Sequence, residues 1–299
     1  IVKNNSRRFI NTIKVGGPIA LNGGTLNLSQ SLLLDSDVDI RSAGIINGNN
    51  YQLVLPGKVS TFNLPSTIFT WNLTLNCVKL YMQSDLVLKV PVTIQGDCEI
   101  NGNGYSLSLD HTAGITIASG ASLLMSDVVV KNVSGTKVGF AATTSQLILQ
   151  DVVWCLVGNT TLATGYFNLI GNWYNNGPYS LTYTSAQTST LAANAQLFMG
   201  YGSIFNYSPT SSAQNLISFA DATSKLLLNS ATLTASTVGW QLTKGSLIID
   251  GKSYINSTGT TALTGIILGD GVAANDLNIE LLPGANVQLA GYVGYKNVN

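Results

Sequence analysis

The chain has 299 residues, and 45% of them are hydrophobic, which is a normal share for a protein that buries an apolar core. Its charge is unusual, because only 9% of the residues are Asp, Glu, Lys or Arg and the 14 acidic residues cancel the 14 basic ones. The scattered charge excludes a nucleic-acid partner, and the lack of an apolar stretch of about 18 residues or more excludes a membrane span.

Residues 1–23 predict an N-terminal arm or a first strand. The segment starts IVKNNSRRFI, without an initiator Met and without a signal peptide, which is typical of a processed chain. We therefore expect an extracellular protein or one located on the cell surface.

Residues 24–157 predict regular coils, because the sequence repeats itself there. INGNNYQLVL at 46–55 returns as INGNGYSLSL at 100–109, and the longer windows 32–55 and 86–109 share 11 identities in 24 positions. A 27-residue period also connects one column of leucines, namely Leu26, Leu53, Leu80 and Leu107. Self-similarity of this kind is typical of a protein in which each repeat stacks on its neighbours.

Each repeat has the pattern of strands that bury one face. Apolar and polar residues alternate, and the spacing of equivalent segments shortens to a 24-residue step between 121–133 and 145–157. We predict an all-β solenoid with coils of about 21–27 residues. The Asn-Gly stretch is expected to form a corner, in which Gly48 and Gly102 supply a positive φ. The neighbouring asparagines are expected to form amide ladders or to satisfy local backbone groups, and these are Asn47, Asn49, Asn101 and Asn103.

Two segments of this region resemble a known superfamily. VTIQGDCEINGNGYSLSL at 92–109 resembles one coil of the pectin-lyase-like proteins, and LLMSDVVVKNV at 123–133 is similar to their strand-turn-strand units. The resemblance implies a right-handed parallel β-helix and favours the non-catalytic, adhesin-like members found on surfaces. It implies the fold and leaves the activity open, because the superfamily includes lyases, hydrolases, phage tailspikes and adhesins.

Residues 158–215 predict irregular aromatic-rich coils or a lateral excursion. The stretch 166–207 holds ten of the 24 aromatic residues of the chain. These rings either fill widened coils, form a subunit contact, or stack on sugar rings in a carbohydrate-binding row. The residues of the proposed carbohydrate-binding row are Trp173, Tyr174, Tyr179 and Tyr183.

Residues 216–299 predict further β-helix coils and a C-terminal strand. SKLLL at 224–228 returns as GSLII at 245–249, and VQLAGYVGY at 287–295 alternates as a strand does. A solenoid without caps presents open strands at its ends, and a surface of little net charge opposes self-association only weakly. We therefore expect a homo-oligomer or a filament that forms through the ends or the flanks of the solenoid.

Few residues of this chain are suited to catalysis or to metal binding. The one cluster of carboxylates is Asp35, Asp37 and Asp39, which either binds a cation such as Ca²⁺ or forms a solvated outer face of a strand. The lone histidine, His111, is interpreted as a surface residue, because adjacent strand residues such as Asp110 point to the opposite face. We expect no enzymatic activity and no resident cofactor, with Ca²⁺ as the alternative.

The three cysteines make an odd number and have no spacing suited to zinc. They predict buried free thiols, with a disulfide between Cys77 and Cys98 as the alternative.

The sequence as a whole favours a structural or adhesive protein that assembles with copies of itself. A carbohydrate-binding or phage-fibre-like module, with a polysaccharide as its partner, is the second hypothesis. A polysaccharide lyase or hydrolase is the third.

Overall fold

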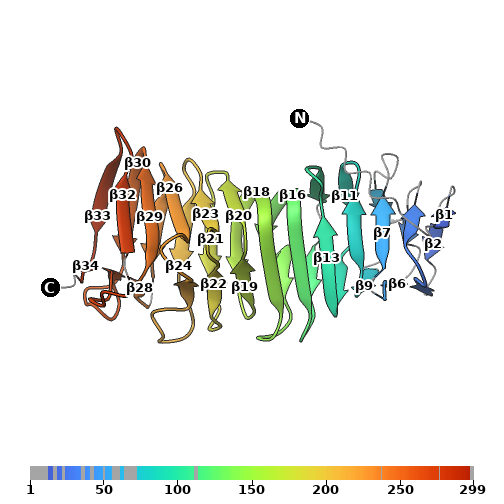
Figure 1. The fold of residues 1–299 in the computed structure, drawn as a ribbon, viewed down its shortest axis with the longest axis horizontal. Helices are drawn as coiled ribbons and strands as arrows, with labels where there is room; N and C mark the ends of the chain where they lie inside the picture. The colour runs from blue at the N-terminus through green and yellow to red at the C-terminus, as the bar shows by residue number, and fades with distance from the viewer. Residues whose placement is uncertain are drawn as a thin grey trace.

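The structure is a computed structural model that describes residues 13–15, 19–21, 24–34, 38–40, 44–49, 51–55, 61–63, 73–110, 114–236, 238–275 and 277–296. These residues form strands, turns and bends and no helix, which confirms the predicted all-β fold. The strands stack into a rod, a parallel β-solenoid of about 10 turns (Figure 1). No described segment forms a helix that is long and apolar enough to cross a membrane.

One sheet of 25 strands runs along most of the rod. Its strands are β1 (Ile13–Val15), β2 (Ile19–Leu21), β4 (Leu32–Leu34), β5 (Val38–Ile40), β7 (Gln52–Leu55), β8 (Thr61–Asn63), β10 (Lys79–Met82), β11 (Leu86–Leu88), β13 (Asp97–Asn101), β14 (Ser106–Leu109), β16 (Ser122–Gly135), β18 (Gln146–Leu162), β19 (Tyr166–Leu169), β20 (Asn172–Asn176), β21 (Ser180–Tyr183), β22 (Ser189–Leu191), β23 (Gln196–Met199), β24 (Ile204–Tyr207), β25 (Ile217–Phe219), β26 (Lys225–Asn229), β27 (Thr232–Ala235), β29 (Gly245–Asp250), β30 (Lys252–Ser257), β32 (Leu277–Leu281) and β33 (Asn286–Ala290).

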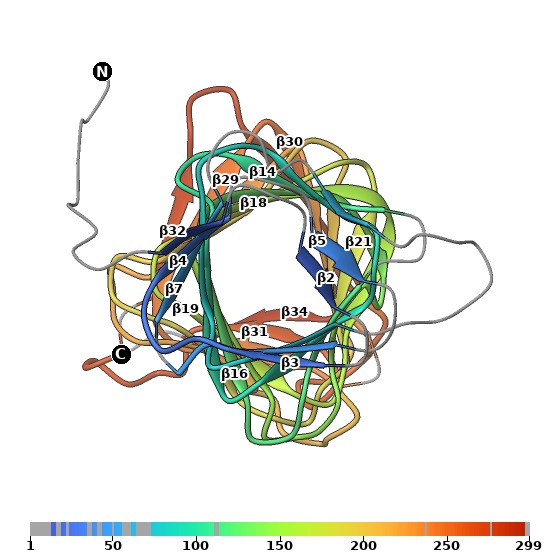
Figure 2. The same ribbon diagram turned by 90° about the vertical axis from the view of Figure 1, so that its right-hand side faces the viewer.

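Two smaller sheets complete the walls of the rod. The six-stranded sheet contains β3 (Thr25–Asn27), β6 (Gly44–Asn47), β9 (Leu73–Asn76), β12 (Val92–Gln95), β15 (Ile115–Ile117) and β17 (Val138–Phe140). The three-stranded sheet contains β28 (Trp240–Leu242), β31 (Ile266–Leu268) and β34 (Val293–Tyr295). A view from the N-terminal end shows β3, β4 and β5 on different sides of the interior (Figure 2).

The strands pair in parallel from one coil to the next. In most of the rod a strand pairs with the third strand after it, as β20 does with β23, β24 with β27 and β30 with β33. The strands β16 and β18 continue past a corner of the rod, and β18 pairs with the three successive strands β19, β20 and β21 of the next coil. At the first corner of each strand a residue has a positive φ, Asp127 in β16 and Asp151 in β18. Alternation of apolar and polar residues keeps one face of each strand inside the rod, so one continuous apolar core runs along it.

The coils vary in length more than the predicted period allows. Leu53 pairs with Leu80, as the 27-residue period predicts. Leu107, however, pairs with Leu86 on another wall, and Leu26 pairs with Ile46 in place of Leu53. The predicted 27-residue column is therefore wrong outside one pair of coils, because corners of different length join the strands.

The repeated ten residues form the same turn at two different corners. The backbone N of Tyr51 donates to the carbonyl of Gly48, and that of Tyr105 donates to the carbonyl of Gly102, both at 2.8 Å. The first copy joins β6 to β7, whereas the second copy joins β13 to β14. The repeated sequence thus specifies a tight turn, and its two copies do not occupy equivalent positions in two coils.

The expected positive φ of Gly48 and Gly102 is wrong. The left-handed conformation belongs to the next residue in each copy, with φ of 47° at Asn49 and 50° at Asn103. The two glycines are needed for a different reason, because a Cβ at either position would collide with the backbone of the following coil.

The asparagines near these corners act in both of the expected ways. Asn47 Nδ2 donates to Asn27 Oδ1 on the preceding coil at 3.1 Å, which is one rung of an amide ladder. Asn49 Nδ2 donates to the carbonyl of Leu28 at 2.9 Å, and Asn101 Oδ1 accepts from the backbone N of Asn103 at 3.0 Å. Side chains therefore satisfy backbone groups that the corner leaves without a strand partner.

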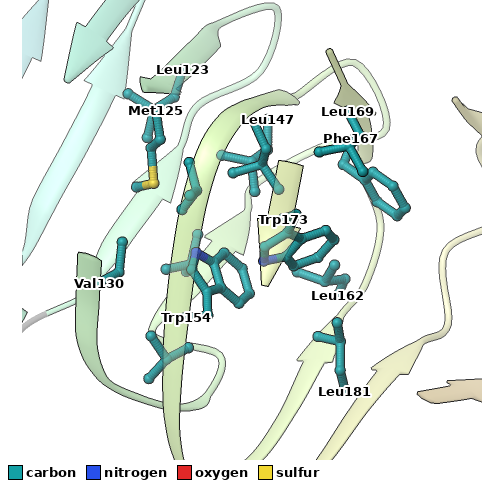
Figure 3. Packing of buried hydrophobic residues seen from close by; sticks show 14 of the residues in the cluster. Leu123, Met125, Val130, Leu147, Trp154, Leu162, Phe167, Leu169, Trp173 and Leu181 are labelled. Atoms are coloured by element: carbon teal, nitrogen blue, oxygen red, sulfur yellow. The ribbon is translucent and has the colours of Figure 1, made fainter. Parts of the chain in front are cut away.

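Residues 158–215 continue the same stack of coils, and five of their aromatic rings are buried inside it, namely Phe167, Trp173, Tyr183, Phe205 and Tyr207. Trp173 packs edge to face against Trp154 at a centroid distance of 4.8 Å and against Phe167 at 5.3 Å (Figure 3). Further along the rod, Tyr207 stacks on Tyr183 at 6.2 Å and on Trp240 at 5.1 Å. Aromatic residues thus fill the interior of the coils in this part of the rod.

Candidate functional site

The last coil of the rod exposes residues at positions that the preceding coil buries. Ile255 in β30 is 1% exposed, whereas Leu289, its partner in register on β33, is 58% exposed. Ile249 in β29 is likewise 1% exposed, whereas its partner Leu281 on β32 is 52% exposed. On the third wall, Tyr295 of β34 is 65% exposed. These residues occupy inward positions of the alternation, so a further coil would bury them.

The same three strands have a free backbone edge. Within the part of the chain that the structure describes, β32 pairs only with β29, β33 only with β30, and β34 only with β31. A strand edge of this kind presents unpaired N–H and C=O groups and is a template for another strand. We call β32, β33 and β34 the open coil. Figure 1 shows this coil at the end of the rod opposite to β1 and β2.

A second candidate is an open pocket of about 120 Å³ on the outer face of the rod. It is lined by Gln52, Lys79, Leu80, Tyr81, Glu99 and Asn101. Lys79 lies at the centre of this group, because it pairs in register with Gln52 on one side and with Glu99 on the other. The pocket offers an ammonium, a carboxylate, two amides and a phenol ring, which together suit a small polyhydroxylated ligand.

The four aromatic residues expected to bind carbohydrate do not form one exposed row. Trp173 is fully buried and Tyr183 is 1% exposed, so neither ring is available to stack on a sugar. Tyr174 and Tyr179 are half-buried, and Tyr174 contacts Phe198 at a centroid distance of 5.4 Å. Such burial counts against a sugar-stacking row. Alternation within β20 places Trp173 inside and Tyr174 outside.

Two of the buried tyrosines hold loops on the surface of the rod. The Tyr207 hydroxyl donates to the carbonyl of Ala213 at 3.2 Å and accepts from the backbone N of Leu216 at 3.2 Å. The Tyr183 hydroxyl donates to the carbonyl of Gln187. Burial raises the pKa of both hydroxyls, so they stay protonated and keep donating well above neutral pH.

The predicted cation site falls largely outside the described residues. Asp35 and Asp37 lie there, as does His111. Asp39 is the middle residue of β5 and pairs in register with Ala20 and Asn63. Among the residues that the structure does describe, no group of three His, Cys, Asp or Glu side chains is placed to hold a metal ion.

The three cysteines are free thiols in the structure. Cys98 is buried, accepts a hydrogen bond from the backbone N of Val78 at 3.3 Å, and lies one coil after Cys77. Burial raises the pKa of the Cys98 thiol to about 11, and a thiol of this kind reacts slowly with electrophiles near neutral pH.

A group of polar atoms without partners lies inside the rod. The side-chain nitrogens of Trp154 and Trp173 and both amide atoms of Asn175 are buried and make no hydrogen bond with the described residues. Trp154 and Asn175 pair in register on neighbouring coils. Each such group costs about 1–3 kcal/mol of stability, so these unpaired atoms weaken the core at this place.

Sequence reasoning foresaw open ends but did not single out Leu281, Leu289 or Tyr295. Their segment alternates as the interior coils do, so the pattern does not separate these exposed residues from buried ones. The pocket was also missed, because its residues come from three strands whose register the 27-residue period predicts only in part.

No protein-family model, curated protein or solved structure matches this chain.

Proposed function

We propose that the protein is a structural building block, located outside the cell or on its surface, that works by assembling with copies of itself. The observation that carries the proposal is the open coil, in which Leu281, Leu289 and Tyr295 are each more than half exposed at positions that are inward in the alternation. Exposed apolar residues beside a free strand edge mark an interaction surface.

The charge of the chain also supports self-assembly. The 14 acidic and 14 basic residues give no net charge at neutral pH, so copies of the chain do not repel one another as a whole. A regular rod with a polar outside and an apolar inside provides length and stiffness, which are what a building block needs.

The test is sedimentation of the purified chain over a range of concentrations, together with electron microscopy. We expect rods longer than one solenoid, and we expect Leu289→Lys to prevent their formation, because it places a charge on the open coil. Leu263→Lys is the matched control, since Leu263 is 74% exposed and lies outside the open coil. A wild-type chain that stays monomeric at all concentrations would refute the proposal.

The pocket around Lys79 favours carbohydrate binding as a second candidate function. Tyr81 offers an aromatic ring, and Glu99 and Asn101 offer hydrogen-bonding groups for sugar hydroxyls. A glycan array probed with the wild type and with the double variant Tyr81→Ala and Glu99→Gln tests it. Tyr105→Ala is the control, because Tyr105 is 38% exposed and does not line the pocket. Equal binding by all the variants, or none by the wild type, would reject this candidate.

A further inference from the structure

We infer that two copies of the rod pair side by side and antiparallel, through one row of apolar side chains on the outside of the rod. This inference rests on the proposed function, because it also concerns contact between copies of the chain, and it adds a flank surface that lies away from the open coil. The row runs over the neighbouring strands β16, β18, β20, β23, β26 and β29, which follow one another along the rod (Figure 1).

The row occupies outward positions of these strands. Each member is in register with the next one and has a buried residue on either side of it in its own strand, as Tyr174 has Trp173 and Asn175. We call this row the flank stripe, and its residues are Val129, Val153, Tyr174, Phe198, Leu227 and Ile248. The first five are half-buried, and Ile248 is 8% exposed. The outside of the rod thus has a continuous apolar row over six coils.

The other two walls carry mainly polar residues at outward positions of the same coils. On the wall of β19, β22 and β25, one outward row consists of Asn168, Thr190 and Ser218. On the wall of β21, β24 and β27, the two outward rows are Thr182, Asn206 and Thr234, and Ser180, Ile204 and Thr232. The flank stripe is therefore not a general property of the outside of the rod, and a contiguous apolar row on a surface marks an interaction site.

Charged residues beside the flank stripe change sign along the rod. Each of them lies two positions before or after a stripe residue in the same strand. At one end the acidic residue comes before the stripe and the basic residue after it, namely Asp151 on β18 and Lys131 on β16. At the other end the order is reversed, with Lys225 before the stripe on β26 and Asp250 after it on β29. All four side chains are at least partly exposed.

An antiparallel pair brings these unlike charges together. If the two-fold axis passes between β20 and β23, β16 of one copy faces β29 of the other, and β18 faces β26. Lys131 then lies opposite Asp250 of the second copy, and Asp151 lies opposite Lys225. Both pairs require the same position of the axis, and the symmetry forms each of them twice. Four complementary charge pairs thus select a second copy of this chain as the occupant of the stripe.

A parallel pair of rods matches fewer of these charges. Its two-fold axis would run along the rod, so the two sides of the stripe would face each other within one coil. Among the four flanking charges only Lys131 would gain an unlike partner, which is Asp127 of the other copy on β16. Lys225 would lie opposite the uncharged Asn229 of β26. The antiparallel orientation is therefore the favoured one.

The size of the flank stripe predicts a dimer that depends on concentration. Six strands at about 4.8 Å each cover about 29 Å of the rod, and a strand of five residues is about 17 Å wide. A contact of this size buries on the order of 500 Å² from each copy, which is close to the lower limit for a specific interface. We expect a dissociation constant in the micromolar range.

The first experiment isolates the flank contact by using Leu289→Lys, the variant of the open coil, as the background. Sedimentation over a range of concentrations is expected to show a monomer and a dimer in equilibrium. Phe198→Ser in this background should weaken the dimer at least tenfold, because it removes a ring from the centre of the flank stripe. Ile204→Ser is the matched control, since Ile204 is 37% exposed at an outward position on another wall of the same coil.

Circular dichroism of each variant verifies that it is folded. A Leu289→Lys chain that stays monomeric at every concentration would overturn the inference. Equal dimerisation of the Phe198→Ser and Ile204→Ser variants would overturn it as well, because the flank stripe would then make no contact.

The second experiment tests the charge pairs in the same background. Lys131→Asp and Asp250→Lys, each alone, are expected to weaken the dimer about tenfold, and the two together to restore it. In one chain these residues lie five coils apart, which is about 24 Å and exceeds the Debye length at about 0.1 M salt. Restoration at that salt concentration must therefore come from contact between two copies, which separates it from a folding defect.

The orientation is tested by a second partner for the Lys131→Asp variant. Lys131→Asp combined with Asp127→Lys is expected to leave the dimer weak, because these two residues face each other only in a parallel pair. If this combination restores the dimer and the combination with Asp250→Lys does not, the copies are parallel, and the inferred orientation is overturned.

The outcomes distinguish this inference from the proposed function. If the wild type forms long rods but the Leu289→Lys chain is monomeric at every concentration, the copies meet only through their ends, and only the inference is overturned. If the wild type forms nothing larger than the dimer of the Leu289→Lys chain, the inference stands and the role of the open coil is overturned. If the wild type remains monomeric, both are overturned.

Discussion

The last two coils of the rod have the same alternation of residues and differ in exposure. Ile255 is buried between two coils, whereas Leu289, its partner in register, pairs with one coil only among the described residues and is 58% exposed. The comparison shows that each coil of a solenoid forms a core with its neighbours and has little core of its own. The contribution of a side chain to the free energy of unfolding therefore depends on whether coils cover it on one side or on both.

The largest difference in the free energy of unfolding is expected between a substitution in the aromatic core of an interior coil and one on the open coil. Trp173→Ala should lower the free energy of unfolding by about 3–5 kcal/mol, because it removes a fully buried ring between Trp154 and Phe167. Tyr295→Ala on the open coil should lower it by less than about 0.5 kcal/mol. Urea denaturation of the monomer, followed by far-ultraviolet circular dichroism, measures both. A loss below about 1 kcal/mol for Trp173→Ala would contradict its place in the core.

The interior coil and the open coil can be compared directly at Ile255 and Leu289, which pair in register. Ile255→Ala is expected to lower the free energy of unfolding by about 2–5 kcal/mol, and Leu289→Ala by less than about 1 kcal/mol. The same urea experiment, at a concentration below the onset of assembly, gives both values. Equal losses would mean that the open coil is already covered in the monomer.

The interior coils should also make the protein sensitive to alkaline pH. Burial raises the pKa of Cys98 from 9.0 to about 11 and raises that of Tyr207 as well, so both groups hold their protons more tightly in the folded state. This contribution is fully present below pH 9 and is lost as the pH rises through 11, by on the order of 2 kcal/mol for Cys98. Urea denaturation between pH 8 and 11 tests it, and Cys98→Ala should flatten the decline. If the loss of stability with rising pH is the same in the Cys98→Ala variant, groups other than Cys98 cause it.

The smallest expected change in the free energy of unfolding concerns Asn175, a polar residue buried inside the rod. Asn175→Leu is expected to raise the free energy of unfolding by about 1 kcal/mol, because it replaces a buried amide that has no partner among the described residues. Asn172→Leu on the same strand is the control. It should lower the free energy by about 1 kcal/mol, since Asn172 Nδ2 donates to Asp151 Oδ1 at 2.7 Å. A destabilised Asn175→Leu variant would show that the amide has a partner in solution.

Local features of the fold could be predicted from the sequence because they depend on a few adjacent residues. Alternation identified the strands, and the turn shared by 46–55 and 100–109 has the same backbone hydrogen bond in both copies. The 24-residue match is confirmed where Val128 pairs with Val152. These features need no knowledge of the neighbouring coil.

The register between coils could not be predicted in the same way. A match in sequence shows that two corners have the same shape, but it does not show that they lie on the same side of the rod. Leu107 thus matches Leu80 in sequence and pairs instead with Leu86. Because corner lengths vary, the number of residues in a coil is set by contacts that a single period does not describe.

The burial of the candidate site residues could not be predicted from the sequence either. Trp173 and Tyr174 are adjacent aromatic residues in a variable segment, and nothing in their composition separates the buried ring from the half-buried one. Their position on β20 decides it, since one faces the core and the other faces outward. The exposure of Leu289 depends on the coils that lie beside it in the rod, which the pattern of its own segment does not contain.

The parallel pairing of the coils has a mechanical consequence. Backbone hydrogen bonds between successive strands run along the axis of the rod, so a pulling force on its two ends loads all the bonds of one coil together. Tension along the axis is therefore shared among the walls of each coil, and a coil gives way only when the bonds of its walls break together.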